Sequence, residues 1–182
     1  MVIFKGYGAT VLQQPTINLN LIENKLLDVG TSDFTPLAAG MFQGWRVLRN
    51  EKMRNKETSS VLVVISDGIA NIPLERPLTS LTRRKFLNAV QADVLDMAGL
   101  LQREKIQTII VNTTHGEKMA ASASKYASLI PTKSGKRWLD PTSLLLEITR
   151  ITGGYYYGIG EGGNLEATVL MDAFSLNRGQ KP

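Results

Sequence analysis

The feature that most constrains the fold is a short apolar run, "VLVVIS" at 61–66, that ends abruptly on Asp67 and Gly68. The run is far too short to cross a bilayer. Unbroken apolar segments of this length are typical of strands covered on both faces of a parallel sheet. A second segment that reads as a buried strand, "IQTIIVN" at 106–112, follows a stretch with helical spacing at 83–103. This order of strand, helix and strand predicts an α/β fold.

The remaining segments continue the alternation of strands and helices. Asn18 or Asn20 is expected to cap a short helix that Gly30 ends at the C′ position, and Thr35-Pro36 to open the next helix. Asp140-Pro141 and Gly153 bound a later helix. The expected strands are two around Gly6 and Gly8, then 61–66, 106–114 and 155–160; further helices are expected over 122–130 and 164–174, before a tail at 175–182.

Length and composition indicate one soluble domain. The chain has 182 residues, 43% of them hydrophobic, and no cysteine, so disulfides and thiolate metal sites are excluded. No signal peptide is recognisable at the start, and we expect a cytoplasmic protein without membrane contact. The net charge of +5 gathers in three basic clusters, at 46–56, 83–85 and 133–137. Aromatic residues do not interleave with them, so a solvated surface is favoured over nucleic-acid binding.

Asp67 is the first candidate for chemistry, because ligands of open α/β sheets bind beyond the carboxyl ends of the strands. A carboxylate there, with hydroxyls from Ser66 or Thr35, makes a set of hard oxygen donors suited to magnesium or manganese. The alternative is structural: Asp-Gly pairs often close a turn through their own backbone. Local sequence alone favours the turn.

Two other features are weaker candidates for chemistry. Gly158, Gly160 and Gly163 fit G-x-G-x-x-G, but only 19 residues follow, so no second strand could carry a ribose-binding acid. His115 is the only histidine, and with no cysteine in the chain an ordinary loop role is favoured. A small α/β enzyme using Asp67, His115 or the 158–163 loop would lack a complete catalytic constellation. A phosphate-binding G-x-x-x-x-G-K-[ST] loop is also absent.

Two motifs together resemble a known family. "TPLAAG" at 35–40 and "DGIANIPL" at 67–74, with "ITGGYYYGIG" at 151–160, are similar to the von Willebrand factor A domain of magnesium-chelatase D-type subunits and their cobaltochelatase relatives. The resemblance covers nearly the whole chain, 1–182. It implies a three-layer, Rossmann-like α/β domain with a mostly parallel sheet.

The resemblance also implies a metal-ion-dependent adhesion site at the top of the sheet. In this sequence Thr35 and Asp67 match its threonine and aspartate, with Ser66 a further candidate ligand. Such a site holds Mg²⁺ with a position open to a partner's carboxylate, so it joins proteins rather than breaking bonds. The implied partners are an AAA+ chelatase subunit and the large porphyrin-binding subunit of an ATP-dependent tetrapyrrole metal chelatase. A generic A-domain adhesion or scaffolding module is the alternative function.

This sequence departs from the family pattern in ways that lead to two expectations. The D-x-S-x-S motif is absent, Ile69 replaces the usual arginine, and the segment 125–148 is longer than in bacterial relatives. The first strand and helix of the domain, and the AAA+ part, are not seen. We therefore expect weak binding of Mg²⁺ to this chain alone. We also expect two open sheet edges, at 2–5 and 61–66, which a complementing N-terminal fragment or self-association would cover.

Overall fold

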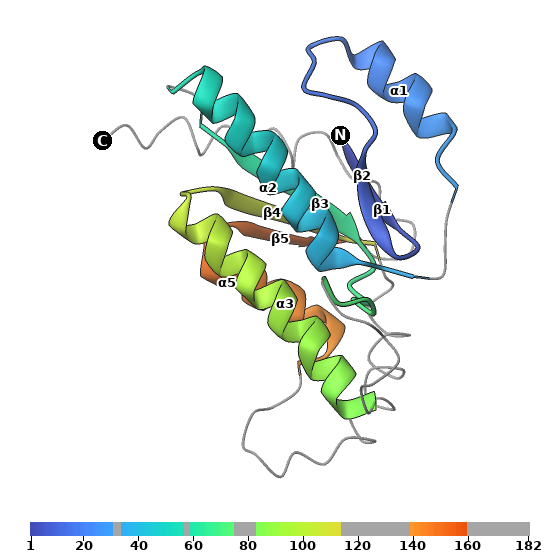
Figure 1. Cartoon of the computed structure of the whole chain (residues 1–182), viewed down its shortest axis with the longest axis vertical. Helices are drawn as coiled ribbons and strands as arrows, with labels where there is room; N and C mark the ends of the chain where they lie inside the picture. The colour runs from blue at the N-terminus through green and yellow to red at the C-terminus, as the bar shows by residue number, and fades with distance from the viewer. Residues whose placement is uncertain (31–33, 57–58, 75–82, 114–138, 160–182) are drawn as a thin grey trace.

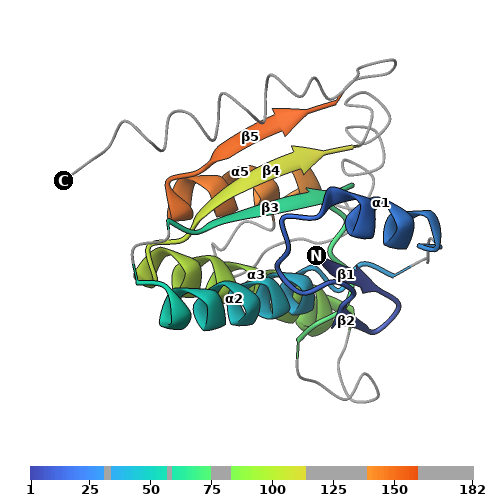
Figure 2. The ribbon, with the colours of Figure 1, turned by 90° about the horizontal axis from the view of Figure 1, so that it is seen from above.

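A computed structural model describes residues 1–30, 34–56, 59–74, 83–113 and 139–159 of the chain. Its main sheet consists of three parallel strands, β3 (Val61–Ser66), β4 (Gln107–Asn112) and β5 (Tyr155–Gly158), with β4 in the centre. Their carboxyl ends are level, because Ser66 pairs with Asn112 and Asn112 with Gly158. Figure 2 shows the three strands side by side and pointing the same way. The predicted α/β fold with a parallel sheet is confirmed.

The first two strands form a separate antiparallel hairpin. Strand β1 (Val2–Lys5) pairs with β2 (Gly8–Val11), and Gly6 in the turn has a φ of 60°, which a glycine adopts without strain. The hairpin lies on the β3 side of the main sheet (Figures 1 and 2). Among the described strands, no pairing joins the hairpin to β3. The part of the chain that the structure describes therefore shows no pairing between 2–5 and 61–66.

Three helices cover one face of the main sheet and enclose the core. They are α2 (Leu37–Arg54), α3 (Arg83–Arg103) and α5 (Pro141–Thr152). From the sheet, Val64 and Ile110 point into this layer and are at most 4% exposed. The helices contribute Leu37, Met41, Val94, Met97, Ala98, Leu101, Leu144, Leu145 and Ile148. The helical spacing predicted over 83–103 is thus the one that buries α3 against the sheet.

The opposite face of the sheet carries a second, smaller cluster. Ile109 and Val111 of the central strand are buried there, with Val61, Val63, Tyr155, Tyr157 and Ile159 packed partly around them. Burial on both faces explains why the middle of β4, residues 109–111, is entirely apolar. The predicted helices at 122–130 and 164–174 lie outside the described residues.

Helix α5 has both predicted end signals. Asp140 caps its start, since the side chain accepts a hydrogen bond from the Ser143 N–H at 2.9 Å. Gly153 ends it in the left-handed conformation, with φ 66°. The next residue, Gly154, has a different reason to be glycine: a Cβ there would lie 1.8 Å from the Thr108 carbonyl oxygen. Adjacent glycines therefore turn the chain and let it pass close over β4.

Two predicted helix ends are displaced in the structure. Helix α1 (Leu19–Leu27) is capped at its C-terminus by Asp28, so Gly30 does not occupy the C′ position that the sequence suggested. None of its residues is buried, so no packing fixes where it ends. Helix α2 starts at Leu37 with Pro36 in the cap position, one residue later than the expected first helical turn.

Candidate functional site

The loop that follows β3 folds back on itself through its own side chains. The Ser66 hydroxyl accepts a hydrogen bond from the Gly68 N–H at 3.1 Å, and Asp67 Oδ1 accepts one from the Ile69 N–H at 3.2 Å. Gly68 has a φ of 81°, and a Cβ at this position would lie 2.9 Å from Leu145 Cδ1. Asp67 therefore does close the turn through the main chain. The hydrogen bond from the Ile69 N–H occupies one carboxylate oxygen, Oδ1.

Thr35 is joined to this loop by a reciprocal pair of hydrogen bonds with Asn71. The Thr35 N–H donates to Asn71 Oδ1 at 2.7 Å, and the Asn71 N–H donates to the Thr35 carbonyl oxygen at 3.2 Å. Thr35 lies just before α2 and Asn71 lies four residues after Asp67. The structure thus brings the two segments that carry Thr35 and Asp67 together at the carboxyl end of the sheet.

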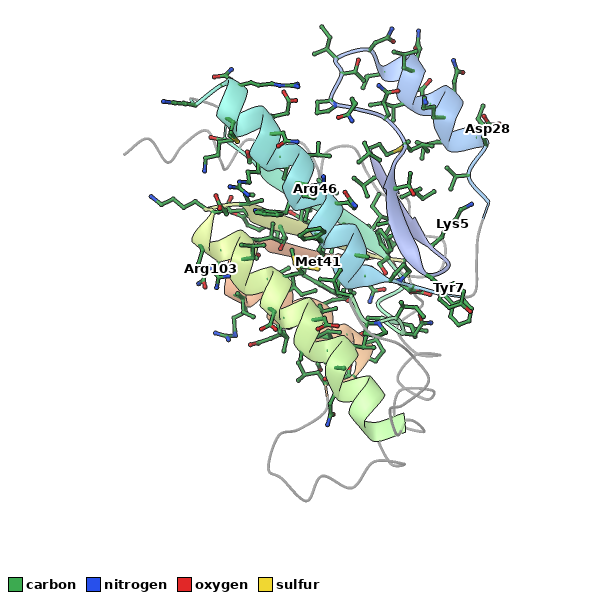
Figure 3. The ribbon with its side chains drawn as sticks, in the orientation of Figure 1. Lys5, Tyr7, Asp28, Met41, Arg46 and Arg103 are labelled. Atoms are coloured by element: carbon green, nitrogen blue, oxygen red, sulfur yellow. The ribbon has the colours of Figure 1, made fainter. Side chains whose placement is uncertain are left out.

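The same loops are fixed at their outer ends. The Leu74 N–H donates to Asp93 Oδ2 of α3 at 2.9 Å, which anchors the end of the 67–74 loop. On the other side, the Tyr7 ring at the hairpin turn packs on Phe34, with centroids 4.9 Å apart. Figure 3 shows Tyr7 at the tip of the hairpin and Met41 between α2 and α3. Hairpin, α2 and α3 therefore all position the Thr35 and Asp67 segments.

A buried asparagine marks the end of the central strand at the same edge. Asn112 is 3% exposed, and its Nδ2 donates to the Tyr156 hydroxyl at 2.9 Å. Its carbonyl oxygen also accepts the Ile159 N–H at 2.8 Å. Sequence reasoning missed both Asn71 and Asn112. A buried asparagine at the end of a strand is the signal that could have drawn attention to Asn112. Asn71 lies five residues beyond β3 and carries no such signal.

The candidate oxygen donors suit a hard cation only in part. Thr35 and Ser66 can offer hydroxyl oxygens and Asp67 a carboxylate, which are donors that Mg²⁺ prefers. Asp67 is the only anion among these three, and the described residues contain no group of three or more His, Cys, Asp or Glu placed to hold a metal. Such a set would leave much of the coordination to water or to a partner. The assignment of Thr35, Asp67 and Ser66 as metal ligands stays a prediction.

The other sequence candidates fall mainly outside the described residues. His115 and residues 160–163 of the glycine loop lie there, as does the basic cluster at 133–137. Gly158 is described and belongs to β5, where it pairs with Asn112. Its place is that of a strand residue.

The basic face of α2 makes contacts within the chain. Lys52 Nζ donates to the Glu104 carbonyl oxygen at 3.0 Å, and Arg54 pairs with Glu51 at 2.9 Å. The Arg49 guanidinium lies over the Trp45 ring, 5.2 Å from its centroid. These contacts fit the solvated helix face that the sequence favoured for this cluster.

Two curated relatives and one uncharacterised protein are similar in sequence to this chain. The magnesium-chelatase 67 kDa subunits of Chlorobaculum parvum and Chlorobaculum tepidum are each 26% identical over 127 residues, or 70% of this chain. An uncharacterised protein of Mycobacterium tuberculosis is 30% identical over 83 residues, or 44% of the chain and 13% of its own length. The chain spans about 20% of the length of the chelatase subunits. No family model matches the sequence.

One solved structure is similar in fold to this chain. The conserved hypothetical protein BatB from Bacteroides thetaiotaomicron superposes with a TM-score of 0.55 over 98% of this chain and 77% of its own, at 13% identity. The likeness supports the α/β, Rossmann-like arrangement of the described residues. A likeness at this identity concerns the fold alone. Among the described helices, none has the length and apolar character needed to span a membrane.

Proposed function

We propose that this chain is a metal-dependent protein-interaction module of an ATP-dependent tetrapyrrole metal chelatase. The distant similarity to magnesium-chelatase 67 kDa subunits supports the chelatase association. The observation that carries the interaction role is the pairing of Thr35 with Asn71, which joins the two candidate ligand segments at one edge of the sheet. The module would contact subunits and perform no bond chemistry itself.

In this proposal Thr35 and Asp67, with Ser66, hold Mg²⁺. The ion supplies a positive charge with coordination positions that a carboxylate from a partner can fill. Asn71 keeps the Thr35 segment beside the Asp67 loop, and Gly68 gives the loop its tight turn. The proposed partners are the AAA+ subunit and the large porphyrin-binding subunit. The expected cytoplasmic location stays a prediction.

The experiment compares two aspartate variants in a subunit-binding assay. Asp67→Asn keeps the shape of the side chain and the bond to the Ile69 N–H but removes the charge needed for Mg²⁺. Asp28→Asn removes the same charge at the exposed end of α1, and serves as the matched control. Binding of the purified chain to an immobilised large chelatase subunit is measured by surface plasmon resonance, in 5–10 mM Mg²⁺ (on the order of a weak site's need) and in EDTA.

We expect the Asp67→Asn chain to bind at least about tenfold more weakly in Mg²⁺, a loss typical of one charged contact. The Asp28→Asn chain should bind as the wild type does, and EDTA should abolish the difference. Equal binding of both variants, or binding unaffected by EDTA, would refute a metal-dependent interface.

The alternative, a generic A-domain interaction module unrelated to tetrapyrroles, draws on the structural likeness to BatB, which covers 98% of the chain. The same assay, repeated with an immobilised AAA+ subunit, separates the two functions. A chain that binds Mg²⁺ through Asp67 but does not recognise either chelatase subunit would favour the generic module.

A further inference from the structure

An exposed stripe runs along the side of α2 that does not face the core. It consists of Arg46, Arg49, Asn50 and Met53, all of which are exposed to solvent and none of which is among the buried residues of the helix. Residues three, four and seven positions apart lie along one side of a helix, so these four form a continuous surface. We name it the Arg46–Met53 stripe. The Met53 side chain in it is 72% exposed.

The two arginines of the stripe carry charge that the described chain does not neutralise. The Arg46 guanidinium donates to the neutral Gln43 Oε1 at 3.4 Å, and the Arg49 guanidinium lies over the Trp45 ring. Among the described residues, no acidic group forms an ion pair with either arginine. The one acidic residue of α2 pairs with a different arginine. An acidic group brought by a partner would therefore meet two positive charges that are not already in ion pairs.

Arg49 is also held in place before any partner binds. Its guanidinium lies 5.2 Å from the centroid of the Trp45 ring, and Trp45 in turn packs on Phe42 with ring centroids 5.5 Å apart. A planar guanidinium that is already stacked loses less side-chain freedom when it binds a carboxylate. Arginine, methionine and aromatic residues are also the types enriched at protein–protein interfaces. The stripe therefore has the chemistry of a contact surface.

We propose that the Arg46–Met53 stripe binds an acidic helix of a partner protein. Two carboxylates of that helix, three or four residues apart, accept hydrogen bonds from Arg46 and Arg49, because residues at this spacing match the spacing of the two arginines. An apolar residue one turn further along the partner helix packs on Met53. The net charge of +5 attracts such a partner to the chain.

A nucleic acid fits this surface less well. Single strands bind by stacking their bases on free aromatic faces, whereas Arg49 already lies over the Trp45 ring. Phosphate groups would also leave the exposed Met53 without an apolar contact. An acidic helix with an apolar residue satisfies both the arginines and Met53.

The probe is a synthetic peptide as long as α2, 18 residues, in which glutamate and leucine recur on one helical face. The control peptide has the same composition in an order that spreads both residue types around the helix. Fluorescence anisotropy of each labelled peptide is measured against the whole chain, at low salt and in EDTA, because none of the stripe residues is a candidate metal ligand. We expect the patterned peptide to bind at least about tenfold more tightly than the control. Added salt should weaken this binding.

Three substitutions at exposed positions test the stripe directly. Arg49→Glu should weaken binding of the patterned peptide about tenfold or more. Its matched control is Arg150→Glu, which changes the net charge equally at an exposed arginine of α5. Arg49→Lys keeps the charge but loses the planar fork, and should weaken binding about threefold or more. Met53→Ala should weaken it by a similar factor, with Leu146→Ala at an exposed position of α5 as its control.

The proposal is overturned if the two peptides bind equally, or if Arg49→Glu and Arg150→Glu weaken binding equally, because net charge alone would then cause the attraction. It is overturned too if a single-stranded oligothymidine binds more tightly than the patterned peptide and loses that binding in Arg49→Glu, since the ligand would then be a nucleic acid. Asp67→Asn, which tests the proposed function, should leave peptide binding unchanged. Loss of peptide binding in that variant would contradict a contact on the stripe that is independent of the candidate metal site.

Discussion

At the residue scale, single side chains hold the ends of elements in place. Asp140 is the clearest example. Its carboxylate accepts hydrogen bonds from the Ser143 N–H at 2.9 Å and from the Ser143 hydroxyl at 2.6 Å. Partial burial acts to raise the pKa of Asp140, but these hydrogen bonds outweigh it and the pKa lies below its ordinary value of 3.8.

We expect Asp140→Ala to lower the free energy of unfolding by about 1 kcal/mol at pH 7, the usual cost of losing an N-cap. Because the folded-state pKa is lowered, the ionised cap contributes stability above pH 3.8, and this contribution is lost as the pH falls through the folded-state pKa. Urea denaturation of both chains at pH 7 and in the acid range checks both points. A difference between them that stayed constant with pH would show that ionisation of Asp140 plays no part.

Residue chemistry also explains what sequence could and could not predict about the site. The turn at Asp67 and Gly68 and the caps at Asp140 and Gly153 depend on neighbours a few residues away, so the sequence identified them. The bond between Thr35 and Asn71 spans 36 residues and depends on the packing of α2 beside the β3 loop. Nothing in the local sequence of Asn71 indicates that partner.

At the element scale, the glycines of α2 decide how closely its neighbours approach the helix. Its glycines at 40 and 44 sit where the hairpin and β3 approach the helix closely. Glycine in a helix costs about 1 kcal/mol relative to alanine, and the close packing offsets that cost. The two positions differ in what lies opposite. Gly40 faces Cβ, Cγ and Cδ1 of Phe4, whereas Gly44 faces chiefly the end of the flexible Leu62 side chain.

We expect Gly40→Ala to destabilise the chain by about 1–3 kcal/mol, the cost of overpacking a site that cannot relax. Gly44→Ala should change the free energy of unfolding by less than about 1 kcal/mol, because Leu62 can rotate away and the helix gains propensity. Each value comes from urea denaturation with the wild type as reference. Equal losses at the two positions would mean that the Phe4 ring yields as readily as Leu62.

Sequence prediction of the elements succeeded where packing fixes them. Helix α3 spans Arg83–Arg103 as its apolar spacing predicts, because that spacing buries Val90, Val94 and Leu101. Helix α1 carries leucines too, but none of its residues is buried. Its end therefore depends on weak local preferences, and the glycine at position 30 did not decide it.

At the scale of the whole molecule, the described strands divide into a parallel sheet with a buried core and a hairpin that does not pair with that sheet. A two-stranded hairpin is marginally stable by itself. Here it depends on side-chain contacts, such as Phe4 against α2 and Tyr7 against Phe34.

We expect the hairpin to open independently of the rest of the domain. Amides of β1 and β2 should exchange at least about a hundredfold faster than those of Ile109 and Ile110 in the core, because local opening exposes little buried surface. Native-state hydrogen exchange at low urea concentrations measures both groups. If all of these amides exchange only through global unfolding, with one common free energy, the hairpin and the sheet form a single cooperative unit.

Both ends of α2 are tied to opposite edges of the domain. The chain entering the helix is bonded to Asn71 beyond the carboxyl end of β3, and near the other end Lys52 bonds to the Glu104 carbonyl oxygen just before β4. An 18-residue helix is about 27 Å long. The helix links these two bonded ends. A partner that displaces the Thr35 segment therefore also displaces the turn that leads into the central strand. Force applied at the carboxyl end of the sheet is thereby transmitted to its amino end.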